Sequence, residues 1–266
     1  MGKYWYVLSI GIQNTLSYRV NFLFRSLFGL IPLTAIISVW KTIFSQGQSS
    51  VAGYTLSAMI SYYLVVTLVD MFTAVAEDDW QIAADIKDGR ISQFLLKPID
   101  YQTYRLTLFC SGRLIYTSVA LLPVLGFIFL QRDFFVLPTH LITYLAFGIS
   151  IALTALLQFF ISYSLALLAF WLQEVSTFIF IVYALEYLAG GHLFPLDILP
   201  PWVFKLLMLT PFPYQLYFPV NVYLEKIQGS ELAAGLVIQS AWVLATYGLA
   251  RWVWHRGVRH YEAVGG

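Results

Sequence analysis

Long apolar runs, separated by short polar connections, constrain this chain more than any other feature of its sequence. Six such runs lie at about residues 22–44, 54–76, 109–130, 141–171, 175–188 and 232–254. A helix needs about 20 mostly apolar residues to cross the hydrocarbon core of a bilayer, and every run except 175–188 reaches that length. We therefore predict an all-α membrane protein with six transmembrane helices, forming a single transmembrane domain over residues 1–266.

The composition agrees with a bilayer as the solvent. Hydrophobic residues make up 59% of the chain and charged residues 11%, whereas a soluble domain is roughly 45–50% apolar and about 25% charged. The net charge of +1 argues against a nucleic-acid-binding protein, which would show a basic excess. Because Cys110 is the only cysteine, the sequence excludes an intrachain disulfide and a multi-cysteine metal site.

The segment before the first apolar run, residues 1–21, mixes aromatic and aliphatic side chains with serine, asparagine, glutamine and arginine. This pattern predicts an amphipathic helix that lies in the membrane interface, with its aromatic rings among the lipid headgroups.

The distribution of lysine and arginine predicts the orientation, because these residues accumulate on the cytoplasmic side of membrane proteins. With both termini in the cytoplasm, eleven of the 15 lysines and arginines lie inside or at the inner edge. The other four lie outside: Lys41, Arg132, Lys205 and Lys226. We therefore place both termini and the connection at 77–108 in the cytoplasm, and the connection at 189–231 outside.

The cytoplasmic connection has the pattern of a small helix–turn–helix. Apolar residues recur at helical spacing from 80 to 86, after an aspartate pair, Asp78 and Asp79, that could cap the helix. Asp88 and Gly89 predict a turn, and a short amphipathic piece follows. Two interpretations stay open: a solvated loop on the membrane surface, or a docking element whose mixed charges suit a protein partner better than anionic lipid.

The external connection contains six prolines around a short apolar stretch, residues 202–209. A stretch of this length cannot cross a bilayer, so we predict a re-entrant or interfacial segment. It could cap the helix ends or act as a gate for a substrate, and the two roles are compatible.

Among the charged residues within the apolar runs, Asp70, Arg113 and Glu186 are the candidates for polar sites inside the membrane. A charge at the bilayer centre costs roughly 2.5–3.5 kcal/mol, so each should face protein or water. We favour a structural pair of Asp70 with Arg25 or Arg113 over a substrate contact, and Glu186 could bond the loop backbone near residues 190–191. Aromatic rings that could stack on a cationic substrate are Tyr62, Tyr63, Phe159, Phe160, Tyr163 and Tyr183.

The sequence carries no sign of catalysis. It has no G-x-x-x-x-G-K-[ST] phosphate loop, and no histidine has metal-ligand spacing with a second ligand on its helix face. We predict that the chain is not an enzyme and binds neither a cofactor nor a metal.

Two runs resemble permeases of type-2 ABC exporters, in particular the bacterial six-helix ABC-2 family. They are IKDGRISQFLLKP, residues 86–98, and FPLDILPPW with PFPYQLYFPVNVYL, within residues 194–224. The resemblance extends over nearly the whole chain, because the number of spans, the placement of the loops and the N-terminal helix also agree.

The resemblance implies two partners: a second permease, the same or a similar chain, and a cytoplasmic ABC ATPase dimer that holds the ATP and magnesium. It places a coupling loop for this ATPase at Asp85, Ile86, Lys87, Asp88, Gly89, Arg90, Leu95, Leu96, Lys97 and Pro98. It places a re-entrant element that closes the outer side at Phe194, Pro195, Leu196, Asp197 and Pro200.

Some members of the family are associated with export of toxic amphipathic cations such as viologens. The resemblance therefore implies a subunit of a bacterial inner-membrane exporter that moves an amphipathic, cationic or lipid-like molecule outward. Two other classes stay open: an ion-coupled secondary transporter, which would show inverted repeats and ionisable residues at the midplane, and a membrane scaffold that transports nothing.

Overall fold

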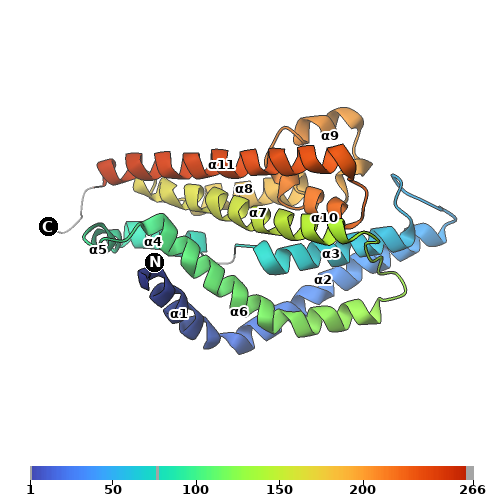
Figure 1. Ribbon diagram of the computed structural model, residues 1–266, viewed down its shortest axis with the longest axis horizontal. Helices are drawn as coiled ribbons and strands as arrows, with labels where there is room; N and C mark the ends of the chain where they lie inside the picture. Colours follow the sequence, from blue (N-terminus) through green and yellow to red (C-terminus); the bar gives the residue numbers. More distant parts are fainter. Residues whose placement is uncertain (1, 76–77, 262–266) are drawn as a thin grey trace.

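The computed structural model describes residues 2–75 and 78–261, and within these residues all regular elements are helices. Five helical stretches are long and apolar enough to cross a membrane. They are α2 (Arg19–Ser45), α3 (Leu56–Thr73), α6 (Tyr101–Leu130), α7 with the short helix η1 (Leu141–Phe170) and α11 (Gly229–His260). Most of them follow the long axis of the molecule (Figure 1). The predicted all-α class is confirmed.

The prediction of six transmembrane helices is not confirmed, because the fifth apolar run, 175–188, forms a shorter helix, α8 (Ser176–Ala189). At 1.5 Å per residue, 14 residues rise only about 21 Å, against a hydrocarbon core about 30 Å thick. The helix ends where the Gly190 amide donates to the Glu186 carbonyl at 2.7 Å. Gly191, with φ of +98°, then turns the chain into the proline-rich segment.

The two long connections lie at opposite ends of the molecule (Figure 1). Helices α4 (Asp78–Lys87) and α5 (Ile91–Leu95) lie at one end, near the start of α1 and the end of α11; we call this the α4 end. Helices α9 (Pro201–Leu207) and α10 (Tyr217–Tyr223) lie at the other, the α9 end. Glu77, the first residue of the predicted cytoplasmic connection, lies outside the described residues. Which end faces the cytoplasm stays a prediction.

Helix α6 begins at Tyr101, eight residues before the apolar run that predicted it. The Asp100 carboxylate caps it by accepting from the Thr103 amide at 2.9 Å, and Arg251 of α11 donates to the other oxygen at 2.5 Å. Although burial raises the pKa of Asp100, these hydrogen bonds hold it below its usual range. The apolar run marks only the part of the helix that can lie in lipid, whereas the cap determines where the helix starts.

The N-terminal helix, α1 (Gly2–Leu16), packs along α6. Gly11 faces Ser111 so closely that a Cβ at position 11 would overlap that side chain. At the α4 end, Lys3 donates to the Pro98 carbonyl at 2.5 Å, and the Asp100 amide donates to the Tyr4 hydroxyl at 3.2 Å. Helix α1 is therefore fixed to the end of the α4–α5 connection; its place in the membrane interface stays a prediction.

Helices α7 and α11 are joined by a buried glutamine. The Gln239 amide nitrogen lies 3.1 Å from the Ser150 carbonyl, 3.0 Å from the Thr154 hydroxyl and 2.8 Å from the Tyr214 carbonyl. Its amide oxygen accepts from the Ser150 hydroxyl at 3.0 Å. Since a buried amide is stable only when its hydrogen bonds are made, Gln239 fixes how the two helices and the short 3₁₀ helix η3 (Phe212–Tyr214) fit together.

Glu225, shortly after the end of α10, anchors the start of α7. Its carboxylate accepts from the amides of Thr139 and His140, each at 3.0 Å, and from the hydroxyls of Thr139 at 2.7 Å and Thr143 at 2.9 Å. The hydrogen bonds from Thr139, followed by that from His140, lower the pKa of Glu225 to about 2. A carboxylate at a helix N-terminus is also favoured by the helix dipole.

We expect the Glu225→Gln variant to have a lower thermal midpoint than the wild type at pH 7. A depressed pKa stabilises the fold above the unfolded-state pKa, and this contribution disappears as the pH falls through the folded-state pKa. The difference between variant and wild type should therefore shrink from about pH 4.5 toward pH 2. Differential scanning fluorimetry across this range measures it. Glu231→Gln, at an exposed glutamate in the first turn of α11, is the matched control, and a difference that does not change with pH would contradict the prediction.

Candidate functional site

The α4–α5 connection folds as the predicted helix–turn–helix. Helix α4 buries Ile82, Ala83 and Ile86 against α7 and η1. Gly89 has φ of +73°, the left-handed conformation that glycine adopts most readily after a helix. Ile91, the first residue of α5, is buried beside them.

The outer face of the connection combines charges with exposed leucines. Lys87, Asp88 and Arg90 are exposed, as are Lys97 and Pro98. Between them lie Leu95 and Leu96, and Leu96 is 88% exposed. Of the residues that the resemblance placed in the coupling loop, Ile86 belongs to the core, whereas most of the others lie on this surface. We call the set Lys87, Asp88, Arg90, Leu95, Leu96, Lys97 and Pro98 the loop surface.

Asp85 fixes the loop surface to α6. Its carboxylate lies 3.3 Å from Nε of Arg90 and 3.7 Å from a guanidinium nitrogen of Arg105, and it accepts from the Tyr101 hydroxyl at 2.8 Å. Arg105 is buried. A buried arginine requires a carboxylate partner, so the ion pair constrains the position of α4 relative to the start of α6.

Asp79 connects α4 to α8. The sequence predicted a capping role for Asp78 or Asp79, but Asp79 is buried and accepts a hydrogen bond from the Tyr183 hydroxyl. Burial raises the pKa of the Asp79 carboxyl, and the hydrogen bonds from Tyr183 and from the Trp80 amide oppose that shift. A displacement of α4 would therefore act directly on α8.

At the α9 end, Asp197 joins the re-entrant candidate to its surroundings. One carboxylate oxygen lies 2.7 Å from both the Tyr54 hydroxyl and the Lys226 ammonium, and the other accepts from the Tyr217 hydroxyl. The Lys226 nitrogen also lies 3.4 Å from the centre of the Tyr54 ring. This cluster binds three separate parts of the chain to one carboxylate.

The residues around Asp197 form a short 3₁₀ turn, η2 (Leu196–Ile198). Pro195 and Leu196 are buried, Phe194 is half-buried and Pro200 is exposed. The carbonyls of Gly191 and Leu193 accept from the hydroxyls of Tyr62 at 2.7 Å and Tyr63 at 2.9 Å. The segment before η2 is therefore held against α3, and its re-entry into the membrane stays a prediction.

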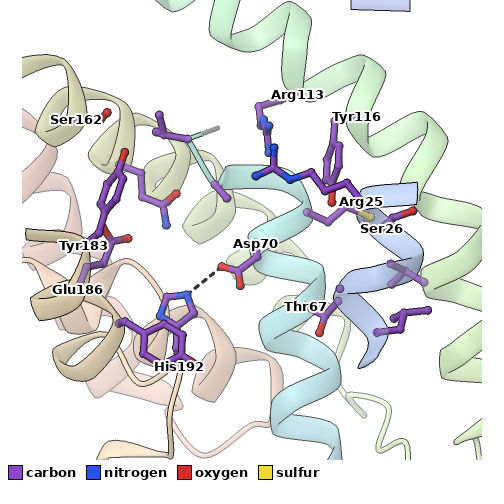
Figure 2. Close-up of a pocket in the computed structure, with 18 of the residues that line it drawn as sticks. Arg25, Ser26, Thr67, Asp70, Arg113, Tyr116, Ser162, Tyr183, Glu186 and His192 are labelled. Carbon is purple, nitrogen blue, oxygen red and sulfur yellow. Dashed lines mark hydrogen bonds and ion pairs between the residues drawn. The ribbon is translucent and has the colours of Figure 1, made fainter. Parts of the chain in front are cut away.

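A cavity of about 450 Å³ lies between α2, α3, α6, α7 and α8; we call it the central cavity. Its charged and histidine lining residues are Arg25, Asp70, Arg113, Glu186 and His192. Its aromatic lining residues are Tyr116, Tyr183 and Tyr187. Figure 2 shows these side chains around the cavity, with those of Arg25 and Arg113 on one side of Asp70 and those of Glu186 and His192 on the other.

Asp70 makes its hydrogen bond to His192, not to the arginines that the sequence favoured. His192 Nε2 lies 3.2 Å from Asp70 Oδ1, and the His192 ring stacks on Tyr187 with 5.2 Å between centroids. The guanidinium groups of Arg25 and Arg113 lie over the Tyr116 ring, 5.9 Å and 4.9 Å from its centre. His192 reaches α3 because the chain turns back at Gly191.

Glu186 lines the central cavity, and the loop backbone near it bonds the Glu186 carbonyl instead of the carboxylate. Of the six aromatic residues proposed to face a cationic substrate, Tyr183 lines the cavity. Tyr62 and Tyr63 bond the chain after α8. Phe159, Phe160 and Tyr163 belong to the core between α6, α7 and α11. Tyr116 and Tyr187 were not predicted as cavity residues. The apolar pattern of one helix cannot show which of its faces lines a cavity that five helices form together.

Comparison with known protein families identifies one family whose model matches this chain. A family model described as "ABC-2 family transporter protein" matches residues 30–265, whereas no curated protein matches the chain. The matched region contains the loop surface and most of the residues that line the central cavity, and it leaves out α1 and the first part of α2. With a match over most of its length, the chain belongs to the ABC-2 transporter family.

Proposed function

We propose that this chain is the permease subunit of an ATP-driven exporter that moves an amphipathic, cationic or lipid-like molecule out of the cell. The family membership implies a membrane component that lacks an ATPase of its own and partners with an ABC ATPase. The outward direction and the class of substrate belong to the proposal.

The observation that carries the proposal is the hydrogen bond between Asp79 and Tyr183. Asp79 belongs to α4, which carries the start of the loop surface, and Tyr183 belongs to α8 and lines the central cavity. An ATPase that pushes on the loop surface would therefore move a wall of the cavity. This direct connection is what an ATP-driven transport cycle requires.

The proposal also assigns each end of the molecule to one side of the membrane. The α4 end faces the cytoplasm of a bacterium, where the ATPase dimer binds, and α1 lies in the inner leaflet interface of the cell membrane. A second permease, the same or a similar chain, completes the complex. The segment around Asp197 forms a re-entrant element that closes the outer side.

ATP-dependent uptake of a fluorescent amphipathic cation into inside-out membrane vesicles tests the proposal. We expect uptake that requires ATP and magnesium. At an ATPase concentration below saturation, the Lys87→Glu, Arg90→Glu double variant should reduce uptake at least about tenfold, since losing about 1.4 kcal/mol of docking energy weakens the affinity for the ATPase by that factor. Lys205→Glu, a charge reversal at an exposed lysine of α9, is the matched control and should transport normally.

Each alternative class gives a different result. Uptake driven by an ion gradient without ATP would identify a secondary transporter, and no uptake with an intact, membrane-inserted protein would indicate a scaffold. Equal transport by the double variant and the wild type would refute docking at the loop surface.

A further inference from the structure

The central cavity separates its charges into two groups. Asp70 and Glu186 come from α3 and α8, with His192 bonded to Asp70. Arg25 and Arg113 come from α2 and α6 and lie over Tyr116. Figure 2 shows the arginine pair on one side of the cavity and Glu186 and His192 on the other. A cavity of about 450 Å³ with opposite charges at its two ends is complementary to a molecule that is itself dipolar.

The arginine end continues into a second cavity. This cavity, of about 410 Å³, lies between α1, α2 and α6 and shares Arg25 and Arg113 with the central one. Its lining combines the polar side chains of Asn14, Thr15 and Asn21 with the apolar ones of Phe22, Leu108 and Phe109, so it can hold a polar headgroup beside an apolar chain. Arg25 and Arg113 thus lie on the boundary of both cavities, and guanidinium groups favour phosphate and carboxylate.

The acidic end suits an ammonium group. The Asp70 carboxylate, which bonds His192, and the Glu186 carboxylate both lie in this part of the cavity. The rings of Tyr183 and Tyr187 line this end, and aromatic rings near carboxylates favour organic cations.

We propose that the central cavity binds a zwitterionic amphiphile, with its ammonium group at Asp70 and Glu186 and its acidic group at Arg25 and Arg113. This inference rests on the proposed function and names the substrate class more narrowly. A simple cation in the cavity meets two guanidinium groups, and a simple anion meets two carboxylates. Such like-charge contacts discriminate against a wrong ligand as effectively as attractive contacts select the right one.

Three probes with the same tail test the inference: hexylphosphocholine, hexyltrimethylammonium and hexyl phosphate. Titration calorimetry measures their binding to the full chain in nanodiscs of a neutral glycolipid, with empty nanodiscs correcting for partition. We expect hexylphosphocholine to bind at least about tenfold more tightly than either of the probes that carry charge of one sign only, a difference of about 1.4 kcal/mol.

Two double variants test which end of the central cavity binds the ammonium group of the ligand and which end binds its acidic group. Arg25→Gln with Arg113→Gln should weaken hexylphosphocholine and hexyl phosphate about tenfold and leave hexyltrimethylammonium as tightly bound or tighter. Asp70→Asn with Glu186→Gln should weaken hexylphosphocholine and hexyltrimethylammonium but not hexyl phosphate. The unaffected probe shows in each case that the variant is folded. Arg132→Gln with Asp133→Asn, an exposed pair outside the cavity, is the matched control and should change no affinity.

Preferred binding of hexyltrimethylammonium, unaffected by the arginine variant, would overturn the zwitterion assignment and leave the proposed transport of a cation intact. Equal affinity for all three probes would overturn it as well. Because binding needs neither ATP nor the ATPase, a failure of ATP-dependent uptake would count against the proposed function alone.

Discussion

Replacing Leu96 with aspartate should detach the ATPase partner and leave the permease folded. Leu96 is 88% exposed, so it contributes little to the stability of the chain itself. A leucine that becomes buried at an interface contributes about 1.5–3 kcal/mol, and an aspartate in its place adds a desolvation cost. We therefore expect the affinity for the ATPase to fall about 10- to 100-fold, as measured by binding of the purified ATPase to the permease in nanodiscs.

The control for this prediction lies at the other end of the molecule. Leu209, after α9, is 73% exposed, and Leu209→Asp carries the same chemical change. Both variants should keep the thermal midpoint of the wild type within about one degree, and only Leu96→Asp should lose the ATPase. Equal binding by both variants would show that the ATPase docks elsewhere.

Replacing Asp197 with alanine should destabilise the α9 end more than any other single change at that end. The variant leaves the Lys226 ammonium and the hydroxyls of Tyr54 and Tyr217 without their shared acceptor. Removing one partner from a partly buried cluster costs about 2 kcal/mol, which corresponds to about 4–8 °C in thermal midpoint for a chain of this size. Fluorimetry of the purified protein measures the shift.

A double-mutant cycle separates the cost of leaving the Lys226 charge unpaired from the cost of lost packing around Asp197. If the stranded Lys226 ammonium causes most of the loss, Lys226→Met should recover part of the thermal midpoint in the Asp197→Ala background while lowering it in the wild type. Asp133→Asn, at an 87% exposed aspartate, is the matched control. Additive effects of the two changes would contradict the assignment of Asp197 as the centre of the cluster.

The α4–α5 connection shows what the sequence could predict. Its helix, its turn and its second helix follow from local signals: apolar residues at helical spacing and a glycine that adopts a positive φ. Such signals depend on near neighbours in the chain, so they survive without knowledge of the fold. The buried position of Ile86 fits the same pattern, whereas the exposed position of Leu96, directly after α5, does not follow from it.

The central cavity shows what the sequence could not predict. Asp70 and His192 are 122 positions apart, and they meet because α8 is short and the chain turns at Gly191. Charge and burial alone suggested an arginine partner for Asp70, since no local pattern reports where a loop folds back. Gln239 escaped notice for a similar reason: its partners on α7 and at Tyr214 are defined only by helix packing.

The central claim is that an ATPase binds the α4 end at the loop surface, and site-specific cross-linking tests it most directly. In a Cys110→Ser background, which removes the only native cysteine, Leu96→Cys and Leu209→Cys each carry a short thiol-reactive photo-cross-linker. We expect the ATPase to be cross-linked by the probe at position 96 and not by the probe at position 209. Cross-linking from position 209 alone, or equal yields from both positions, would contradict the account.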